Sequence, residues 1–163
     1  MRSPTFTAFL VIFFATGFVA RQPAVADDRE TCKNSTGEAA IEACSSAITS
    51  KKFKGRALSL LYTNRGVEYV AKEDIEHAIA DHDQAIKVDP KNSLAFNNRG
   101  NAYSAKHDFE RAIADYDQAI KLDPKNAAAF YNRGIAKQKN GDLAGSETDI
   151  AQAKQLQPSL GQQ

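Results

Sequence analysis

The sequence lacks an excess of charge of either sign, since it contains 21 lysines and arginines and 20 aspartates and glutamates among 163 residues. Without a basic field, nothing favours nucleic acid as a partner. The sequence also lacks a glycine-rich phosphate loop and a long run of like charges. No nucleophile stands beside a base at the spacing of a known catalytic motif. We therefore expect one modest domain with no catalytic residue and no cofactor.

Potential metal ligands are also scarce. The only cysteines are Cys32 and Cys44, which without nearby histidines are too few to hold a metal ion. His77 and Asp81 lie one helical turn apart, but ligand sets of this kind need better geometry than such neighbours provide. We therefore expect no metal site.

A long apolar run occurs only near the N-terminus, from residue 6 to residue 20. Arg2 precedes this run and the small-residue sequence Ala24-Val25-Ala26 follows it, which is the pattern of a secretory signal peptide over residues 1–26. A membrane anchor is the alternative, but the run is shorter than the roughly 20 residues that span a bilayer. We expect cleavage after Ala26, no membrane span afterwards, and a secreted or periplasmic protein.

The two cysteines fit this location. An even number of cysteines in an exported chain predicts a disulfide, here between Cys32 and Cys44. Such a bond would stabilise the fold by about 3 kcal/mol through loop-closure entropy. Two buried free thiols are the alternative if the protein stays in a reducing cytosol.

Most of the chain repeats itself with a period of 34 residues, and this period predicts a stacked repeat architecture. The residues in register are Asn64, Asn98 and Asn132; Arg65, Arg99 and Arg133; Gly66, Gly100 and Gly134; Ala85, Ala119 and Ala153; and Pro90, Pro124 and Pro158.

Each unit has the pattern of two helices. In the middle unit, apolar residues over 109–120 recur at the spacing of an amphipathic helix. Asp108 is a good N-cap for this helix, and Pro124 ends it. Residues 38–48 resemble residues 110–120, so they look like the second helix of a degenerate repeat in which Cys44 takes the place of Tyr116.

The three units resemble the tetratricopeptide repeat (TPR) family, over about residues 59–160. The middle unit carries the family pattern in Phe96, Gly100, Tyr103, Ala112, Tyr116, Ala119 and Pro124. The resemblance implies an all-α solenoid of antiparallel helix hairpins in an exported bacterial protein. We assign residues 27–58 to a degenerate N-terminal helical segment, and the three TPR units to residues 59–92, 93–126 and 127–160.

An arginine precedes an aspartate by 16 residues in every unit, at places that are commonly apolar in the family. This predicts a partly buried charge pair across each hairpin, in which the loss of one partner destabilises more than the loss of both. The expected pairs are Arg65–Asp81, Arg99–Asp115 and Arg133–Asp149. Alternatively, each arginine faces solvent or an acidic ligand.

The repeated asparagines are candidate ligand-binding residues. The resemblance implies that the first helix of each unit lines a concave surface, where asparagines of some family members hold a peptide backbone. Asparagine suits this role because it offers a donor and an acceptor together. The candidate peptide-binding residues are Asn64, Asn98 and Asn132, with Asn97, Asn101 and Tyr131 beside them. Alternatively, these asparagines only pack or cap locally.

Three functions remain in view. The first is a periplasmic scaffold that binds a peptide or a partner protein on the concave surface, because solenoids present extended surfaces. The second is a self-association module that forms a homo-oligomer through an uncapped end. The third, an enzyme or enzyme subunit, has no supporting group of residues, so we expect no enzymatic activity.

Overall fold

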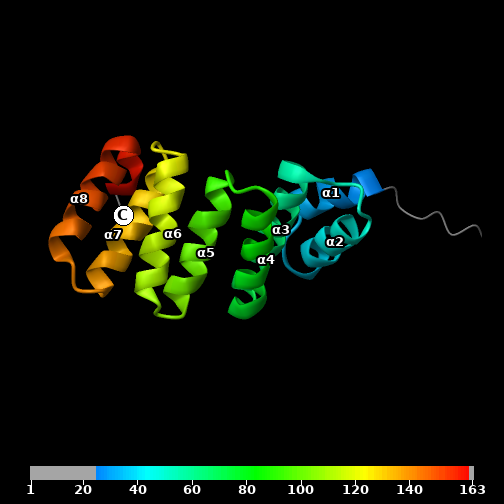
Figure 1. Cartoon of the computed structure of the whole chain (residues 1–163), viewed down its shortest axis with the longest axis horizontal. Coiled ribbons are helices and arrows are strands. Elements are labelled where there is room, and N and C mark those ends of the chain that lie inside the picture. The colour runs from blue at the N-terminus through cyan, green and yellow to red at the C-terminus, as the bar shows by residue number, and fades with distance from the viewer. Residues whose placement is uncertain (1–24, 162–163) are drawn as a thin grey trace, which may run out of the picture.

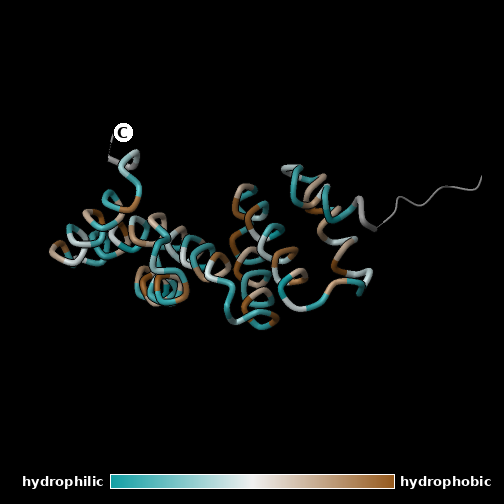
Figure 2. The backbone as a smooth tube through the Cα atoms, turned by 90° about the horizontal axis from the view of Figure 1, so that it is seen from above, coloured by the Kyte–Doolittle hydropathy of each residue, from teal (hydrophilic) through white to brown (hydrophobic). Residues whose placement is uncertain are grey.

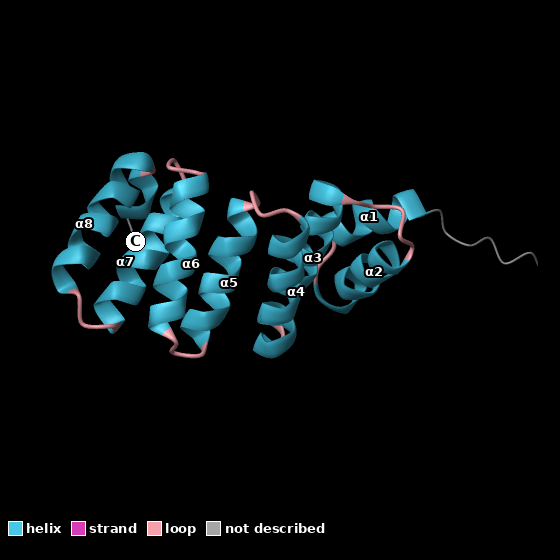
Figure 3. Ribbon diagram, in the orientation of Figure 1, coloured by secondary structure: helices cyan, strands magenta, loops and turns pink. Residues whose placement is uncertain are grey.

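The computed structural model describes residues 25–161, and in this part of the chain the fold is all-α (Figure 1). Short loops join the helices (Figure 3). The helices are α1 (Val25–Asn34), α2 (Gly37–Thr49), α3 (Gly55–Ala71), α4 (Ile75–Val88), α5 (Ser93–Ala105), α6 (Phe109–Leu122), α7 (Ala127–Lys139), α8 (Leu143–Leu156) and the 3-10 helix η1 (Pro158–Gly161). The eight α-helices pack as antiparallel hairpins, which confirms the predicted all-α solenoid.

Side-chain caps fix where most of these helices begin. The carboxylate of Asp108 accepts a hydrogen bond from the backbone N–H of Arg111 and caps α6, as the sequence predicts. Equivalent caps recur at the repeat period, at Asp74 for α4, Asn92 for α5, Asn126 for α7 and Asp142 for α8. The capped helices therefore begin at equivalent positions of their units.

The two helices of a hairpin approach most closely at the repeated glycines. A Cβ atom added at Gly100 would lie 2.7 Å from Cε1 of Tyr116, and one added at Gly66 would lie 2.6 Å from Cε1 of His82. Only glycine leaves room for these rings without a shift of the helix. Alanines buried on the second helices make up much of the remaining contact surface, at Ala78, Ala85, Ala112, Ala119 and Ala153.

The first helix of unit 1 differs from its counterparts. It begins at Gly55, before the predicted unit boundary at residue 59, and has 17 residues where α5 and α7 each have 13. The additional turn carries Leu58, which packs with Leu61 against the cluster around Cys44. The longer helix thus covers the apolar surface of the degenerate N-terminal hairpin.

That hairpin consists of α1 and α2 and is crosslinked. Cys32 of α1 and Cys44 of α2 form a disulfide with a Cα–Cα distance of 4.7 Å, as predicted. Both side chains are buried, Cys44 completely. Since α1 has only 10 residues, it is too short to be stable in isolation, and its position depends on this crosslink and on its packing.

The hairpins follow one another along the long axis of the molecule (Figure 2). Helix α5 contacts both α3 and α7, whereas α4, α6 and α8 contact no other second helix in the described part of the chain. Because first helices approach one another and second helices do not, the stack curves with α3, α5 and α7 on its inner side. These three helices therefore form the concave surface.

Two expectations concern the N-terminal region. The predicted signal peptide lies outside the described residues, except for its last two, Val25 and Ala26, which begin α1. Among the described helices, none is long and apolar enough to cross a bilayer.

Candidate functional site

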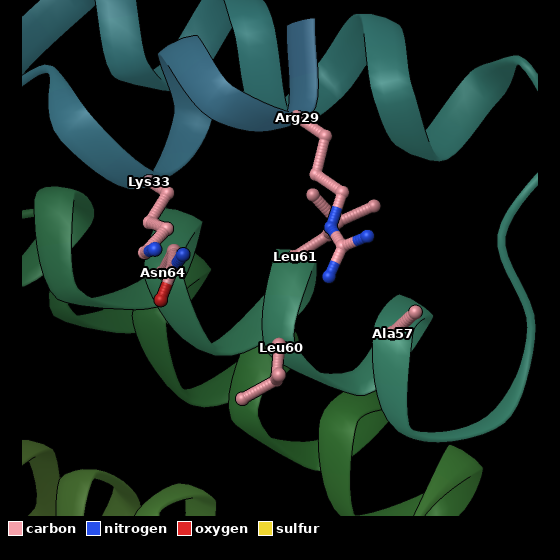
Figure 4. A pocket seen from close by; sticks show the side chains of 6 residues that line it. All are labelled: Arg29, Lys33, Ala57, Leu60, Leu61 and Asn64. Carbon is pink, nitrogen blue, oxygen red and sulfur yellow. The ribbon is translucent and has the colours of Figure 1, made fainter. Parts of the chain in front are cut away.

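The concave surface contains three successive hollows, which we call the groove. The first, of about 180 Å³, lies between α1 and α3 (Figure 4). The second, of about 130 Å³, is lined by residues of the first and middle units, and the third, of about 340 Å³, by residues of the middle and last units. The lining residues are Arg29, Lys33, Ala57, Leu60, Leu61 and Asn64 in the first; Val67, Val70, His82, Asn98 and Asn101 in the second; and Asn101, Ser104, Tyr116, Tyr131, Asn132 and Ile135 in the third.

The groove contains the three repeated asparagines, which we call the asparagine ladder. Asn64 lines the first hollow, Asn98 the second and Asn132 the third. Each side chain is partly exposed. The repeat period therefore places one amide in each hollow.

Hydrogen bonds join the asparagines of units 2 and 3. The Asn132 amide donates to Oδ1 of Asn97 over 3.3 Å and to Oδ1 of Asn101 over 3.0 Å. Oδ1 of Asn101 also accepts a hydrogen bond from the hydroxyl of Tyr116 over 2.8 Å. The Asn97 amide donates to Oδ1 of Asn98 over 3.2 Å. These bonds hold the amides of the second and third hollows in fixed orientations.

Several groove atoms have no hydrogen-bond partner within the part of the chain that the structure describes. They are Nδ2 of Asn98, Nδ2 of Asn101, Oδ1 of Asn132 and both amide atoms of Asn64. None of them is buried, so each is open to the groove. The set offers both donors and an acceptor, as a peptide backbone requires.

Asn97 has a different position from the other candidates. Its side chain is buried, and it bonds to Asn98 and Asn132 from behind the groove. Thr63, the equivalent residue of unit 1, is also buried. Tyr131, the equivalent residue of unit 3, is partly exposed and lines the third hollow. Asn97 therefore holds the amides of Asn98 and Asn132 in place and, unlike the other candidates, is itself buried.

The three expected arginine–aspartate pairs are all within hydrogen-bonding distance. In unit 2, Nε and Nη2 of Arg99 donate to the two carboxylate oxygens of Asp115 over 2.8 and 2.6 Å. The same two-point contact joins Arg65 to Asp81 and Arg133 to Asp149. The arginine side chains are 16 to 20% exposed and the aspartates 5 to 7%, so the pairs lie within the hairpins.

A further partner of each arginine was missed by the sequence analysis. Nη1 of Arg99 donates to Asp83 of the preceding unit, and Nη1 of Arg133 donates to Asp117. In unit 1 the corresponding partner is the hydroxyl of Ser45. Asp83 and Asp117 also recur at 34 residues, and this repetition was the available signal. Each arginine thus links its own hairpin to the one before it.

The charge pairs are reflected in the pKa values of their members. Hydrogen bonding to the partner aspartate is the main reason why the pKa of Arg65, Arg99 and Arg133 is raised. Burial alone would raise the pKa of Asp149, but hydrogen bonds from Arg133 and Lys137 outweigh it and hold that pKa below its ordinary value. Asp149 is therefore ionised at neutral pH.

His82 is a buried polar residue next to the groove. It is fully buried behind the second hollow, and among the residues that the structure describes neither ring nitrogen has a hydrogen-bond partner. In unit 2 the equivalent Tyr116 bonds to Asn101, but unit 1 has Val67 at the place of Asn101. Burial, followed by the charge of Arg99, lowers the pKa of His82 to about 4. The ring is therefore neutral at physiological pH.

His77, which the sequence analysis considered for metal binding, is in contact with Asp74. Nδ1 of His77 lies 2.8 Å from Oδ2 of Asp74, while Asp81 is held by Arg65. Over residues 25–161, no group of three histidine, cysteine or carboxylate side chains is arranged to hold a metal ion.

The comparison with known proteins agrees with this architecture. The TPR repeat family matches residues 66–107 and 100–141. The second TPR domain of human RPAP3, in complex with the HSP70 peptide SGPTIEEVD, is 32% identical, with a TM-score of 0.58; the match covers 60% of this chain and 81% of that one. The chain therefore belongs to the TPR repeat family. No match was found among curated proteins.

Two further solved structures are similar. The second TPR domain of Spaghetti (RPAP3), bound to the HSP90 peptide SRMEEVD, is 29% identical with a TM-score of 0.60, and the match covers 68% of this chain and 98% of that one. The Sgt2 TPR domain from Aspergillus fumigatus is 26% identical with a TM-score of 0.62, covering 64% and 70% respectively.

Proposed function

We propose that this protein is an interaction scaffold that holds an extended peptide segment of a partner protein in the groove. The observation that carries the proposal is the series of open amide atoms on Asn64, Asn98 and Asn132, one residue in each hollow. Amides bind a peptide backbone whatever its side chains are, so the ladder supplies affinity and the hollows supply selectivity. Two similar TPR domains are described with bound peptides, which supports this use of the fold.

The test is peptide binding by variants of the ladder. A random library of acetylated and amidated decapeptides is screened against the protein, and an enriched peptide is titrated by fluorescence anisotropy. One hydrogen bond contributes about 1 kcal/mol, so Asn98→Ala should weaken binding about fivefold to tenfold. The triple change of Asn64, Asn98 and Asn132 to alanine should nearly abolish binding if the three sites act independently.

The chain offers a matched control for this experiment. Gln84, Gln118 and Gln152 share the same 34-residue period, but they lie on the second helices α4, α6 and α8. Their triple change to alanine should leave affinity unchanged. If both triple variants bind the peptide equally well and circular dichroism shows intact helicity, the ligand binds outside the concave surface.

We further propose that the scaffold works in an oxidising compartment, the periplasm of a bacterium, after export. The sequence motif over residues 1–26 and the disulfide between Cys32 and Cys44 support this location. Mass spectrometry of the native protein should give Asp27 as the N-terminal residue. A soluble native protein that retains Met1 would contradict export.

Self-association is a second candidate function, and one observation favours it. Leu143, the first residue of α8, is 62% exposed and lies in the last hairpin of the stack. An exposed leucine at the end of a repeat array is a place where another copy can pack.

A further inference from the structure

The second hollow of the groove has a histidine where the third hollow has a tyrosine. Val67 and His82 line the second hollow in the same register in which Asn101 and Tyr116 line the third. The hydroxyl of Tyr116 donates a hydrogen bond to Oδ1 of Asn101, whereas the side chain of Val67 offers His82 no polar partner. The second hollow therefore lies where unit 1 lacks a hydrogen bond that unit 2 makes within itself.

The packing of the hairpin holds the ring of His82 in place. A Cβ atom added at Gly66 would lie 2.6 Å from Cε1 of His82, and one added at Gly100 would lie 2.7 Å from Cε1 of Tyr116, so the two rings pack against their first helices in the same way. His82 is fully buried, and within the described part of the chain both of its ring nitrogens are without a partner. Because a buried polar group without a partner costs free energy, a ligand that supplies the partner binds more tightly.

Two amide groups face the histidine across the second hollow. Oδ1 of Asn101 accepts hydrogen bonds from Tyr116 and Asn132, and this leaves Nδ2 of Asn101 as its free donor. Oδ1 of Asn98 likewise accepts a hydrogen bond from Asn97 and leaves Nδ2 as the free donor. The hollow thus combines amide donors with a neutral imidazole, of which one nitrogen accepts a hydrogen bond and the other donates one.

The remaining wall of the hollow is aliphatic. Val67, which is 43% exposed, and Val70 form this wall on α3. The hollow measures about 130 Å³, less than half of the third hollow at about 340 Å³. It therefore has room for a small side chain, and an apolar atom of that side chain would cover Val67.

This combination selects among small side chains. A carboxylate would lose its hydration beside two valines, and no cation lines the hollow in the described part of the chain. A carboxamide would bring two N–H donors to one acceptor nitrogen, and a purely aliphatic side chain would leave His82 unpaired. A hydroxyl group donates one hydrogen bond and accepts others, and in threonine it stands beside a methyl group.

We propose that the second hollow is a specificity pocket for a threonine side chain of the bound peptide. The proposal rests on the proposed function, because the pocket is a subsite of the same groove. The threonine hydroxyl donates a hydrogen bond to the acceptor nitrogen of His82 and accepts one from Nδ2 of Asn101, while the methyl group contacts Val67 and Val70. The ligand hydroxyl thus does in unit 1 what the Tyr116 hydroxyl does in unit 2.

The variants that test the pocket come from the repeat itself. His82→Phe removes both ring nitrogens, and the larger ring of Tyr116 at the equivalent place shows that the hairpin accommodates phenylalanine. Val67→Asn/His82→Tyr instead supplies the missing hydrogen bond from within the chain. His77→Phe is the matched control, because it makes the same substitution at an exposed position of the same helix, α4. Circular dichroism should show wild-type helicity for all three, and if His82→Phe loses it, the double variant carries the test.

The experiment is a positional-scanning library of acetylated and amidated decapeptides, screened against the oxidised full-length protein. The wild type and His77→Phe should enrich threonine at one position, with serine second. When this threonine is changed to the isosteric valine, affinity for the wild type should fall about tenfold, and affinity for His82→Phe should change less than about twofold. Val67→Asn/His82→Tyr should also lose the preference for threonine.

The outcomes separate the pocket from the groove. Peptides that bind the wild type with no preference for a hydroxyl side chain would overturn the pocket and leave peptide binding by the groove standing. A threonine preference that persists in His82→Phe would also overturn it, because the hydroxyl would then bind elsewhere. A preference for asparagine or for valine at the sensitive position would replace threonine by another occupant. If no peptide binds the wild type or the variants, the groove and its pocket are both wrong.

Discussion

At the scale of single residues, His82 makes the stability of the protein depend on pH. The folded state holds this histidine neutral, with a pKa of about 4, because the ring is buried and close to the charge of Arg99. The unfolded chain takes up the proton near the ordinary value of 6.5, so protonation favours unfolding. Stability is therefore complete above about pH 6.5 and falls as the pH is lowered to about 4, by roughly 3 kcal/mol at most.

The measurement is urea denaturation between pH 7.5 and pH 4 for the wild type and for Val67→Asn/His82→Tyr. This double variant rebuilds in unit 1 the hydrogen bond that joins Tyr116 to Asn101 in unit 2. Carboxylates titrate in both proteins, so the difference between the two curves reports His82. Parallel curves would show that the folded protein accepts the proton on His82 without penalty.

The paired arginines give a second prediction at this scale. Asp115 is only 7% exposed in the wild type, and Arg99→Ala removes its two-point partner, so we expect a loss of about 3 to 5 kcal/mol in the free energy of unfolding. Lys106→Ala removes a charge whose partner Glu76 is 74% exposed, and this should cost less than about 1 kcal/mol. Thermal and urea denaturation check both variants. Equal losses would mean that the buried pair contributes no more than a surface pair.

Repetition explains which of these residues could be located from the sequence. The arginine–aspartate pairs and the asparagines of the hollows recur in three units, and a helix hairpin places residues 16 apart side by side. Asn97 shows the limit, because the sequence alone does not reveal that its side chain turns behind the groove.

At the scale of elements, the degenerate hairpin of α1 and α2 is the part that depends on covalent chemistry. Reduction of the Cys32–Cys44 bond should release α1 first, since this helix has 10 residues and lies at the end of the stack. The three complete units should remain helical, because neighbours in a solenoid contact only neighbours. Hydrogen exchange with and without reductant should show loss of protection confined to α1, α2 and the first turn of α3. Uniform loss over all helices would contradict this.

Local sequence patterns predict where some helices begin but not others. The cap at Asp108 placed the start of α6 correctly, because a cap is a local signal, and the structure shows the same cap one period away at Asp74 and Asp142. The start of α3 at Gly55 was not predicted, since it is set by burial of Leu58 against the crosslinked hairpin. That contact belongs to the tertiary structure and has no counterpart in the later units.

At the scale of the whole molecule, the arginine contacts between successive hairpins determine the geometry of the groove. Each arginine contacts its own hairpin and the preceding one, so the angle between successive units is restrained. The first helices consequently stay at fixed spacing, and the three hollows keep their register. A groove held in this way meets an extended ligand with little ordering cost, which favours binding by a preorganised surface.

The last prediction distinguishes a peptide-binding scaffold from a self-association module. Leu143 is 62% exposed, but a single exposed leucine is common on monomeric proteins. We therefore expect light scattering to give the mass of one chain over a wide range of concentrations, with the same result for Leu143→Gln. A mass that rises with concentration in the wild type and stays constant in Leu143→Gln would show that α8 docks against a second copy. In that case the groove ladder variant should associate as the wild type does, because α3, α5 and α7 would take no part in the contact.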